Sequence, residues 1–447
     1  MKRKFNAGGA LLVAWFVVML CGCSSAGKQA AETEEGLPVI DLSENVEQVS
    51  ALNLSDAVER VEVVPLETTD ESLIKYIGGI EVTENDIWVK NGNTNILRFS
   101  CDGKFRNAVG RRGQGPGEYT WAHSFSIDTA NREVYVISAS SGIFVYDYEG
   151  KFLRMATKVP AANMFQTPDA RIILFENEVL LSRNLPLFAT GDDIESSLWS
   201  VAVADSAFNF AKLFKNPAHI GREKEIASEE HLSPMTGWVN YWVEEPTQID
   251  FYANDMTLKF PDMDTIYTYL PATQSLEPQY AIFTDEPKGD YGLTHEWVKE
   301  RRALGYFTLS GYYPTKDYVY LTGSKDDEVY TYAYDKRDGS VRLAKRREEI
   351  IVRGSALAEA NFGHPMHSIH RYFLLKNDLS GGTFKVDYRS QGKYWISELE
   401  LGSDSGQERI KEIMATAAGT PHGRELTGIL ERADEEDNPI LLIAVLK

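Results

Sequence analysis

The chain is long and acidic: it has 447 residues, 46 of them basic and 66 acidic, which gives a formal net charge of −20. This charge argues against nucleic acid as a partner, because nucleic-acid binding requires basic patches. The length is sufficient for a large hydrophobic core, and three cysteines are too few for the disulfide framework of a small secreted domain.

The first 22 residues have the pattern of an export signal. Lys2, Arg3 and Lys4 form a positive n-region, and residues 10–20 form an apolar run that is too short to span a bilayer comfortably. We therefore expect export. Loss of the three basic residues with the signal would change the net charge to about −23.

The end of this signal, Leu20-Cys21-Gly22-Cys23, resembles the bacterial lipobox. The resemblance implies cleavage before Cys23 and diacylation of its thiol, which would tether a soluble domain to a membrane. An ordinary secretory signal is the alternative. No acidic cluster follows Cys23 directly, which favours the periplasmic side of the outer membrane over the cell surface. Residues 23–50 are predicted to be a lipidated, flexible spacer, and residues 51–447 a single domain that contains only Cys101.

Two segments of the domain repeat one pattern at an offset of 47 residues. The segment 96–105 (ILRFSCDGKF) recurs as 143–152 (IFVYDYEGKF), and the β-forming run before it, 87–89, recurs as 134–136. The Asp-Gly and Glu-Gly pairs predict hairpins, because glycine adopts the positive φ that such turns require. A fixed period of this length indicates a stacked or radial repeat.

Weaker copies of the pattern continue along the chain and give anchors near residues 96, 143, 198, 266, 329 and 386. Four-stranded units of this spacing predict an all-β fold, a six-bladed β-propeller. Helical periodicity is confined to residues 294–304 and 406–418. The apolar strand at 439–446 is predicted to close the ring by pairing with the first strand-like run, 58–66.

Several motifs together resemble a known family. They are VPLET at 64–68, IWV at 87–89, FSCDGKF at 99–105, GRRGQGPGEY at 110–119 and NPIL at 438–441. These motifs are similar to those of the six-bladed β-propeller lipoproteins of Bacteroidota, a family of uncharacterised function, and more distantly to NHL-repeat propellers. The resemblance implies an envelope protein and transfers no catalytic residue to this chain.

A glycine-rich segment, residues 110–119, is the first candidate site. Converging backbone N–H groups and two guanidinium groups could hold a carboxylate or phosphate, and the residues concerned are Arg111, Arg112, Gly113, Gln114 and Gly115. The alternative is a purely structural connection between two blades, in which glycines permit positive φ.

A histidine cluster and an aromatic-rich region are further candidates. His364, His367 and His370 could hold a divalent metal if they converged, although in a strand positions 364 and 367 face opposite sides. Aromatic residues are frequent after position 230, and they either form a platform for sugar rings or fill the spaces between blades. The platform residues are Trp238, Tyr241 and Trp242.

The sequence favours an envelope-anchored, monomeric binding propeller for a protein, small-molecule or glycan ligand, because no catalytic constellation is evident. Nothing in the sequence requires a cofactor, and a divalent metal at the histidine cluster stays an alternative. The alternative is a metal-dependent lyase or lactonase-like hydrolase with its site in the central channel. Because the repeated residues build blades, we expect function in the unrepeated insertions, chiefly 156–265 and 280–320.

Overall fold

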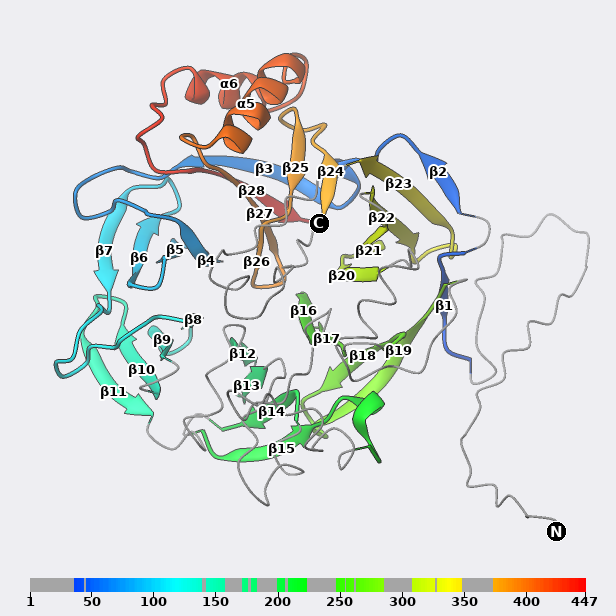
Figure 1. Cartoon of the computed structure of the whole chain (residues 1–447), viewed down its shortest axis with the longest axis horizontal. Helices are drawn as coiled ribbons and strands as arrows, with labels where there is room; N and C mark the ends of the chain where they lie inside the picture. The colour runs from blue at the N-terminus through cyan, green and yellow to red at the C-terminus, as the bar shows by residue number, and fades with distance from the viewer. Residues whose placement is uncertain are drawn as a thin grey trace, which may run out of the picture.

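The computed structural model describes thirteen segments of the chain: residues 36–43, 46–138, 142–156, 171–175, 178–182, 199–205, 208–222, 247–253, 255–260, 263–284, 308–325, 328–347 and 373–447. In these segments the strands form six blades around a centre, as the sequence predicts (Figure 1). Each blade contains four antiparallel strands, the first nearest the centre and the fourth at the rim.

The first three blades follow one another along the chain. Blade 1 contains β4 (Ile77–Val82), β5 (Asp86–Asn91), β6 (Asn95–Ser100) and β7 (Phe105–Val109). Blade 2 contains β8 (Ser124–Asp128), β9 (Glu133–Ser138), β10 (Gly142–Asp147) and β11 (Phe152–Ala156). Blade 3 contains β12 (Arg171–Phe175), β13 (Glu178–Ser182), β14 (Val201–Ala204) and β15 (Phe210–Phe214), and a short 3-10 helix, η3 (Pro217–His219), follows it.

The other three blades complete the ring. Blade 4 contains β16 (Gln248–Tyr252), β17 (Asp255–Lys259), β18 (Thr265–Leu270) and β19 (Ser275–Phe283). Blade 5 contains β20 (Thr308–Pro314), β21 (Tyr318–Lys325), β22 (Glu328–Asp335) and β23 (Val341–Arg347). Blade 6 contains β26 (Tyr388–Ser390), β27 (Tyr394–Leu399) and β28 (Ile440–Leu446), and its fourth strand is β3 (Val58–Pro65), which follows the 3-10 helix η1 (Leu54–Asp56).

The predicted hairpins are confirmed. In blade 1, Ile96 pairs with Val109 and Phe99 with Phe105 across the Asp-Gly turn. Gly103 has a φ of 83°, and a Cβ atom there would lie 2.1 Å from the carbonyl oxygen of Pro65. Glycine is therefore required for both the backbone conformation and the close approach of β3.

Among the described residues the hydrophobic core forms six clusters, one at each junction between neighbouring blades. Side chains alternate along a strand, so one strand serves two junctions. Ile87 and Val89 pack towards blade 6, whereas Trp88, between them, packs towards blade 2. Burial on both faces explains why these strands are continuously apolar in sequence.

Ring closure between the two ends of the domain is also confirmed. Val64 pairs with Leu441 and Val61 with Ala444, which makes β3 and β28 neighbours in one sheet.

The sixth repeat anchor, which the sequence places near residue 386 in the run 383–388, is wrong. Residues 383–385 form β25 (Thr383–Lys385), which pairs with β24 (Leu374–Lys376) in a separate two-stranded sheet. Because β3 supplies the fourth strand, the third position of blade 6 is taken by β28.

Part of the predicted spacer contributes to the sheets. The strand β1 (Val39–Asp41) pairs in parallel with β19, and β2 (Glu47–Val49) pairs in parallel with β23. Both strands cover the outer edges of their blades, where backbone N–H and C=O groups would otherwise lack partners. Residues 39–41 and 47–49 are therefore paired strands and not parts of a flexible linker.

Two helices lie between β27 and β28 in the chain, and they are placed on the outer side of blade 6 (Figure 1). The predicted helix at 406–418 is observed as α5 (Asp404–Thr416), and the Ser403 side chain caps it by accepting a bond from the Gly406 N–H at 3.1 Å. The sequence did not predict α6 (Gly423–Leu430). The other predicted helix, 294–304, lies outside the described residues. No helix in the described part of the chain is long and apolar enough to cross a membrane.

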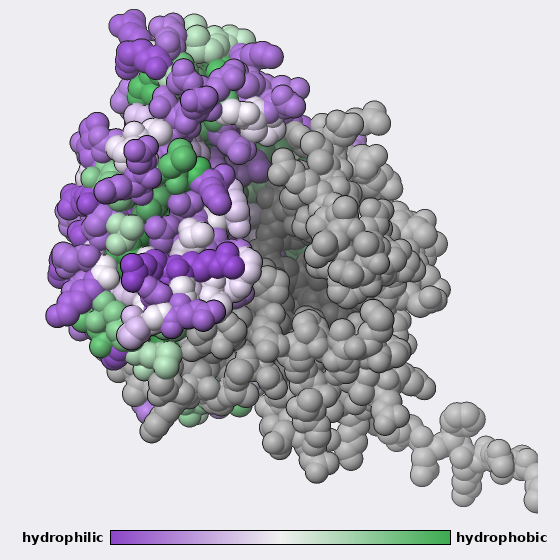
Figure 2. All heavy atoms as spheres, turned by 60° about the vertical axis from the view of Figure 1, so that its left-hand side comes forward, coloured by the Kyte–Doolittle hydropathy of each residue, from purple (hydrophilic) through white to green (hydrophobic). Residues whose placement is uncertain are grey.

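The described surface near blades 1 and 2 is mainly hydrophilic, with separate apolar patches (Figure 2). Exposed apolar side chains on this side include Phe152, Leu153 and Met155 of β11. The predominance of hydrophilic residues on this surface agrees with the acidic composition of the chain.

Candidate functional site

The glycine-rich loop between blades 1 and 2 contains its own anion. The guanidinium of Arg111 forms an ion pair with the carboxylate of Glu118. The backbone N–H of Gly115 donates to the same carboxylate at 2.8 Å. This backbone bond, together with Arg111, holds the pKa of Glu118 below its usual range.

The position of Glu118 explains the small residues around it. A Cβ atom at Gly113 would lie 1.9 Å from the Glu118 carboxylate oxygen, so a larger residue cannot fit without movement. Arg112 stacks on Trp121 with its Cζ atom 4.3 Å from the ring centroid, while the Gln114 side chain is exposed. Two of the donors that the sequence assigns to a bound anion, Arg111 and the Gly115 N–H, are thus engaged by Glu118 of the loop itself.

The other candidate site residues lie outside the described part of the chain. These residues are Cys23, Trp238, Tyr241, Trp242, His364, His367 and His370. Among the described residues, no group of three or more His, Cys, Asp or Glu side chains could hold a metal ion.

Most of the described tyrosines beyond position 306 are core residues. Tyr312, Tyr313 and Tyr320 are each at most 3% exposed, and Tyr313 and Tyr320 pack with Phe373 and Trp395 between blades 5 and 6. For these tyrosines, the interpretation as filling between blades is correct.

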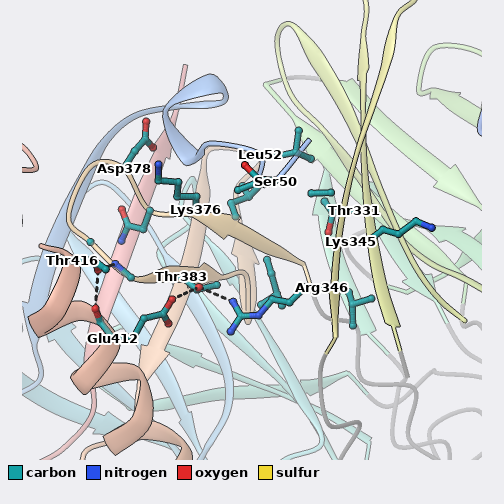
Figure 3. Close-up of a pocket in the computed structure, with 18 of the residues that line it drawn as sticks. Ser50, Leu52, Thr331, Lys345, Arg346, Lys376, Asp378, Thr383, Glu412 and Thr416 are labelled. Atoms are coloured by element: carbon teal, nitrogen blue, oxygen red, sulfur yellow. Dashed lines mark hydrogen bonds between the residues drawn. The ribbon is translucent and has the colours of Figure 1, made fainter. Parts of the chain in front are cut away.

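A pocket of about 540 Å³ lies between blade 5 and the two-stranded sheet β24–β25 (Figure 3). One wall is the face of blade 5 that carries Val329, Thr331, Ala344 and Arg346; the register pairs Val329 with Arg346 and Thr331 with Ala344. The opposite wall is β24–β25 with its turn, and residues 50–52 and α5 complete the lining.

Local backbone bonds position the elements around this pocket. The Lys376 N–H donates to the Leu52 carbonyl at 2.8 Å, which joins β24 to the chain segment that leaves β2. The Gly382 N–H donates to the Thr416 hydroxyl at 2.7 Å, which joins the turn end of the hairpin to α5. The pocket is therefore built from elements that are far apart in sequence.

A chain of polar side chains crosses one side of the pocket (Figure 3). Arg346 of blade 5 donates through Nη1 to the Thr383 hydroxyl at 2.7 Å. Thr383 in turn donates to the Glu412 carboxylate of α5 at 2.8 Å. This chain orients the guanidinium at the pocket wall.

The two carboxylates of the lining are engaged within the protein. Asp378 accepts bonds from the backbone N–H of Ser55 at 3.0 Å and from its hydroxyl at 2.5 Å. Glu412 accepts the bond from Thr383. In contrast, the ammonium of Lys376 has no carboxylate within 4 Å in the described part of the chain. The pocket therefore combines an apolar floor with positive charge at its edge.

The sequence did not predict this pocket, which lies outside the insertions 156–265 and 280–320. Two local signals were present: the Gly381-Gly382 pair, where both glycines have positive φ, and the amphipathic pattern of α5. Neither signal indicates that the hairpin and the helix meet the face of blade 5.

A family model covers most of the chain, and its description names no activity. The family model described as "Domain of unknown function (DUF4934)" matches residues 37–445. The chain is similar to a solved protein of Bacteroides fragilis that is named as exported, with 18% identity, a TM-score of 0.58 and coverage of 92% of this chain and 99% of that one. A DUF4221 member from Bacteroides vulgatus matches with 10% identity and a TM-score of 0.40 over 65% of this chain and 86% of that one. No curated protein matches.

Proposed function

Since the chain belongs to the DUF4934 family, whose description names no activity, we propose from its structure that it is a binding propeller of the cell envelope. In this proposal the protein is exported, carries lipid on Cys23 at the periplasmic side of the outer membrane, and holds a small ligand in the pocket between blade 5 and β24–β25. The solved relative that is named as exported supports the export of this chain.

The pocket is the observation that carries the binding role. Its volume of about 540 Å³ lies within the usual range for small-molecule sites, roughly 300–1,000 Å³. Its composition is also typical of such sites, because buried aliphatic side chains meet a few polar groups. Leu52 and Leu375 are each 1% exposed, and Thr331 is 3% exposed.

Binding at the pocket can be tested by saturation-transfer difference NMR with four named compounds: glucose, N-acetylglucosamine, 1-octanol and octanoate. We expect at least one compound to receive saturation from the wild-type protein. The variant Ala344→Trp places an indole on the wall of blade 5 and should remove that signal. No signal from any compound, or an unchanged signal in a folded Ala344→Trp variant, would contradict the binding role.

Lipid attachment has a separate test with a matched control. Cells that express the full chain are fed an alkyne-tagged palmitate, and incorporation is read by gel fluorescence. Wild type and Cys21→Ala should be labelled, whereas Cys23→Ala should not. Equal labelling of Cys23→Ala, or none of wild type, would overturn the lipid anchor and leave the pocket unaffected.

A further inference from the structure

The pocket floor indicates which part of a ligand it would contact. Leu52, Val329 and Leu375 are each at most 3% exposed and line the pocket. No aromatic side chain is among the described lining residues, so this pocket lacks the ring platform on which sugars stack. An aliphatic body matches these side chains better than a sugar ring does.

The polar edge indicates the charge of a ligand. Arg346 lies on the pocket wall, and its guanidinium is a planar, permanently charged group that suits a carboxylate. The bond to Thr383 fixes the orientation of this group, and Thr383 is itself held by Glu412. Lys345 and Lys376 are also among the lining residues, whereas the carboxylates of Asp378 and Glu412 already accept bonds from Ser55 and Thr383.

We infer that the pocket takes a small amphipathic carboxylate, whose anionic group meets Arg346 and whose aliphatic body contacts the apolar lining, of which Ala344 and Leu374 are partly exposed. This inference rests on the proposed binding function and names its ligand class. The inference predicts that a carboxylate binds more tightly than a neutral or cationic molecule of equal apolar size.

Strand alternation supplies a matched control for Arg346. Lys345 is its neighbour on β23, and its side chain extends away from the pocket in Figure 3. The Lys345 ammonium lies 4.6 Å from the ring centroid of Tyr330, which pairs with it on the opposite face of the sheet. Lys345 is also a lining residue, but only the side chain of Arg346 is directed towards Thr383 in the pocket. Replacement of either residue by glutamine therefore removes one positive charge from the same strand, and only the change at Arg346 removes a guanidinium from the pocket.

The test measures the affinities of octanoate, 1-octanol and octylammonium by isothermal titration calorimetry. Wild type should bind octanoate more tightly than either other compound. Arg346→Gln should weaken octanoate binding by about tenfold or more, since charge-assisted hydrogen bonds are lost, and should leave 1-octanol unchanged. Lys345→Gln should keep octanoate affinity within about twofold, and Thr383→Val should weaken it less than Arg346→Gln does.

Each other outcome has a defined meaning. Equal or tighter binding of 1-octanol or octylammonium would overturn the carboxylate inference and leave a pocket for apolar ligands. An equal loss in Lys345→Gln and Arg346→Gln would show long-range electrostatics rather than contact, and would also overturn it. Octanoate binding that survives in Ala344→Trp would place the ligand elsewhere and contradict the proposed function as well. Melting curves of all variants verify that they fold.

Discussion

The guanidinium of Arg389 forms an ion pair with the carboxylate of Asp250, and this pair joins blade 6 to blade 4 near the centre of the ring. Arg389 also donates to the Tyr312 carbonyl of blade 5 at 3.1 Å and lies over the Tyr313 ring, 4.7 Å from its centroid. One side chain of β26 thus contacts two other blades.

Neighbouring residues of β26 connect blade 6 to blade 1. The Tyr388 hydroxyl donates to the Ile77 carbonyl at 3.1 Å, and the backbone N–H of Val82 donates to the Ser390 hydroxyl at 2.8 Å. The ring is therefore closed twice: by backbone pairing of β28 with β3 towards the rim, and by the side chains of β26 at the centre.

Removal of one partner of the central ion pair should destabilise the ring. The side chains of Arg389 and Asp250 are 18% and 9% exposed. We expect Arg389→Met to lower the free energy of unfolding by about 3 kcal/mol or more, because it removes the guanidinium that is paired with a buried carboxylate. The measurement is urea-induced unfolding followed by tryptophan fluorescence.

Two further variants make this prediction specific. The double variant Arg389→Met with Asp250→Leu should lose less than the sum of the two single variants, because it leaves no unpaired charge. Arg337→Met removes an exposed cation from the Arg337–Asp335 pair and should cost no more than about 1 kcal/mol. Equal losses in Arg389→Met and Arg337→Met would contradict a central role for Arg389.

Deletion of residues 439–447 should abolish cooperative melting. This deletion removes β28, which pairs with β27 on one side and β3 on the other. Deletion of Lys447 alone is the control, because it retains β28 and removes only terminal contacts such as the 2.6 Å bond from the Tyr252 hydroxyl to the Lys447 carbonyl. A truncated protein with the wild-type melting temperature would refute closure of the ring by β28.

The sequence predicted the blades well because each blade junction requires the same local pattern. Continuous apolar runs such as 87–89 are needed wherever a strand is buried on both faces, and a glycine-containing turn, 102–103 or 149–150, connects the third and fourth strands of blades 1 and 2. The error at 383–388 has the same origin. A local β pattern does not reveal whether its strand joins a blade or a separate hairpin. In blade 6 the distant strand β3 supplies the fourth strand, and residues 383–385 pair with β24 in a separate hairpin.

The pocket could not be predicted for a related reason. Arg346, Thr383 and Glu412 belong to a blade, a hairpin and a helix, and none of them has a recognisable motif around it. The glycine-rich loop was conspicuous in sequence, yet the group that occupies its cradle is Glu118 of the same loop. Composition indicated which residue types were present, and tertiary packing decided which of them were already engaged.

Glu398 should make stability fall as pH rises through neutrality. Burial, followed by the nearby Asp387, raises the pKa of this carboxyl from 4.5 to about 7. The folded state therefore holds a proton that the unfolded state releases between pH 4.5 and 7, so the stabilising effect is complete below pH 4.5 and is lost by about pH 7. Over that window the loss is at most ~3 kcal/mol.

The variant Glu398→Gln tests this assignment. Glutamine can keep a hydrogen bond with the Tyr388 hydroxyl, whose oxygen is 3.0 Å from the Glu398 carboxylate in wild type. We expect the variant to gain stability relative to wild type at pH 8 but not at pH 4.5, as measured by urea unfolding at both values. Glu400→Gln removes an exposed charge next to the same strand; because Glu400 raises the pKa of Glu398 less than burial and Asp387 do, its gain at pH 8 should be the smaller of the two.

Lys90 should produce the opposite dependence at alkaline pH. Its side chain is buried, and its ammonium donates to the carbonyls of Gly92 at 3.1 Å and Ala122 at 3.3 Å, which ties the β5–β6 turn to the segment before β8. Burial lowers the pKa of Lys90 from 10.5 to about 8. Between these values the unfolded state binds the extra proton, so stability should rise with pH by at most ~3 kcal/mol.

The comparison of Lys90→Met with Lys104→Met isolates this effect from the other groups that titrate at high pH. Lys104 is exposed, so its replacement should leave the rise in unfolding free energy between pH 7.5 and pH 10 unchanged. Lys90→Met should remove most of that rise, because the unfolded variant no longer takes up the extra proton. An identical rise in both variants would show that the ammonium of Lys90 does not titrate in this range in the folded protein.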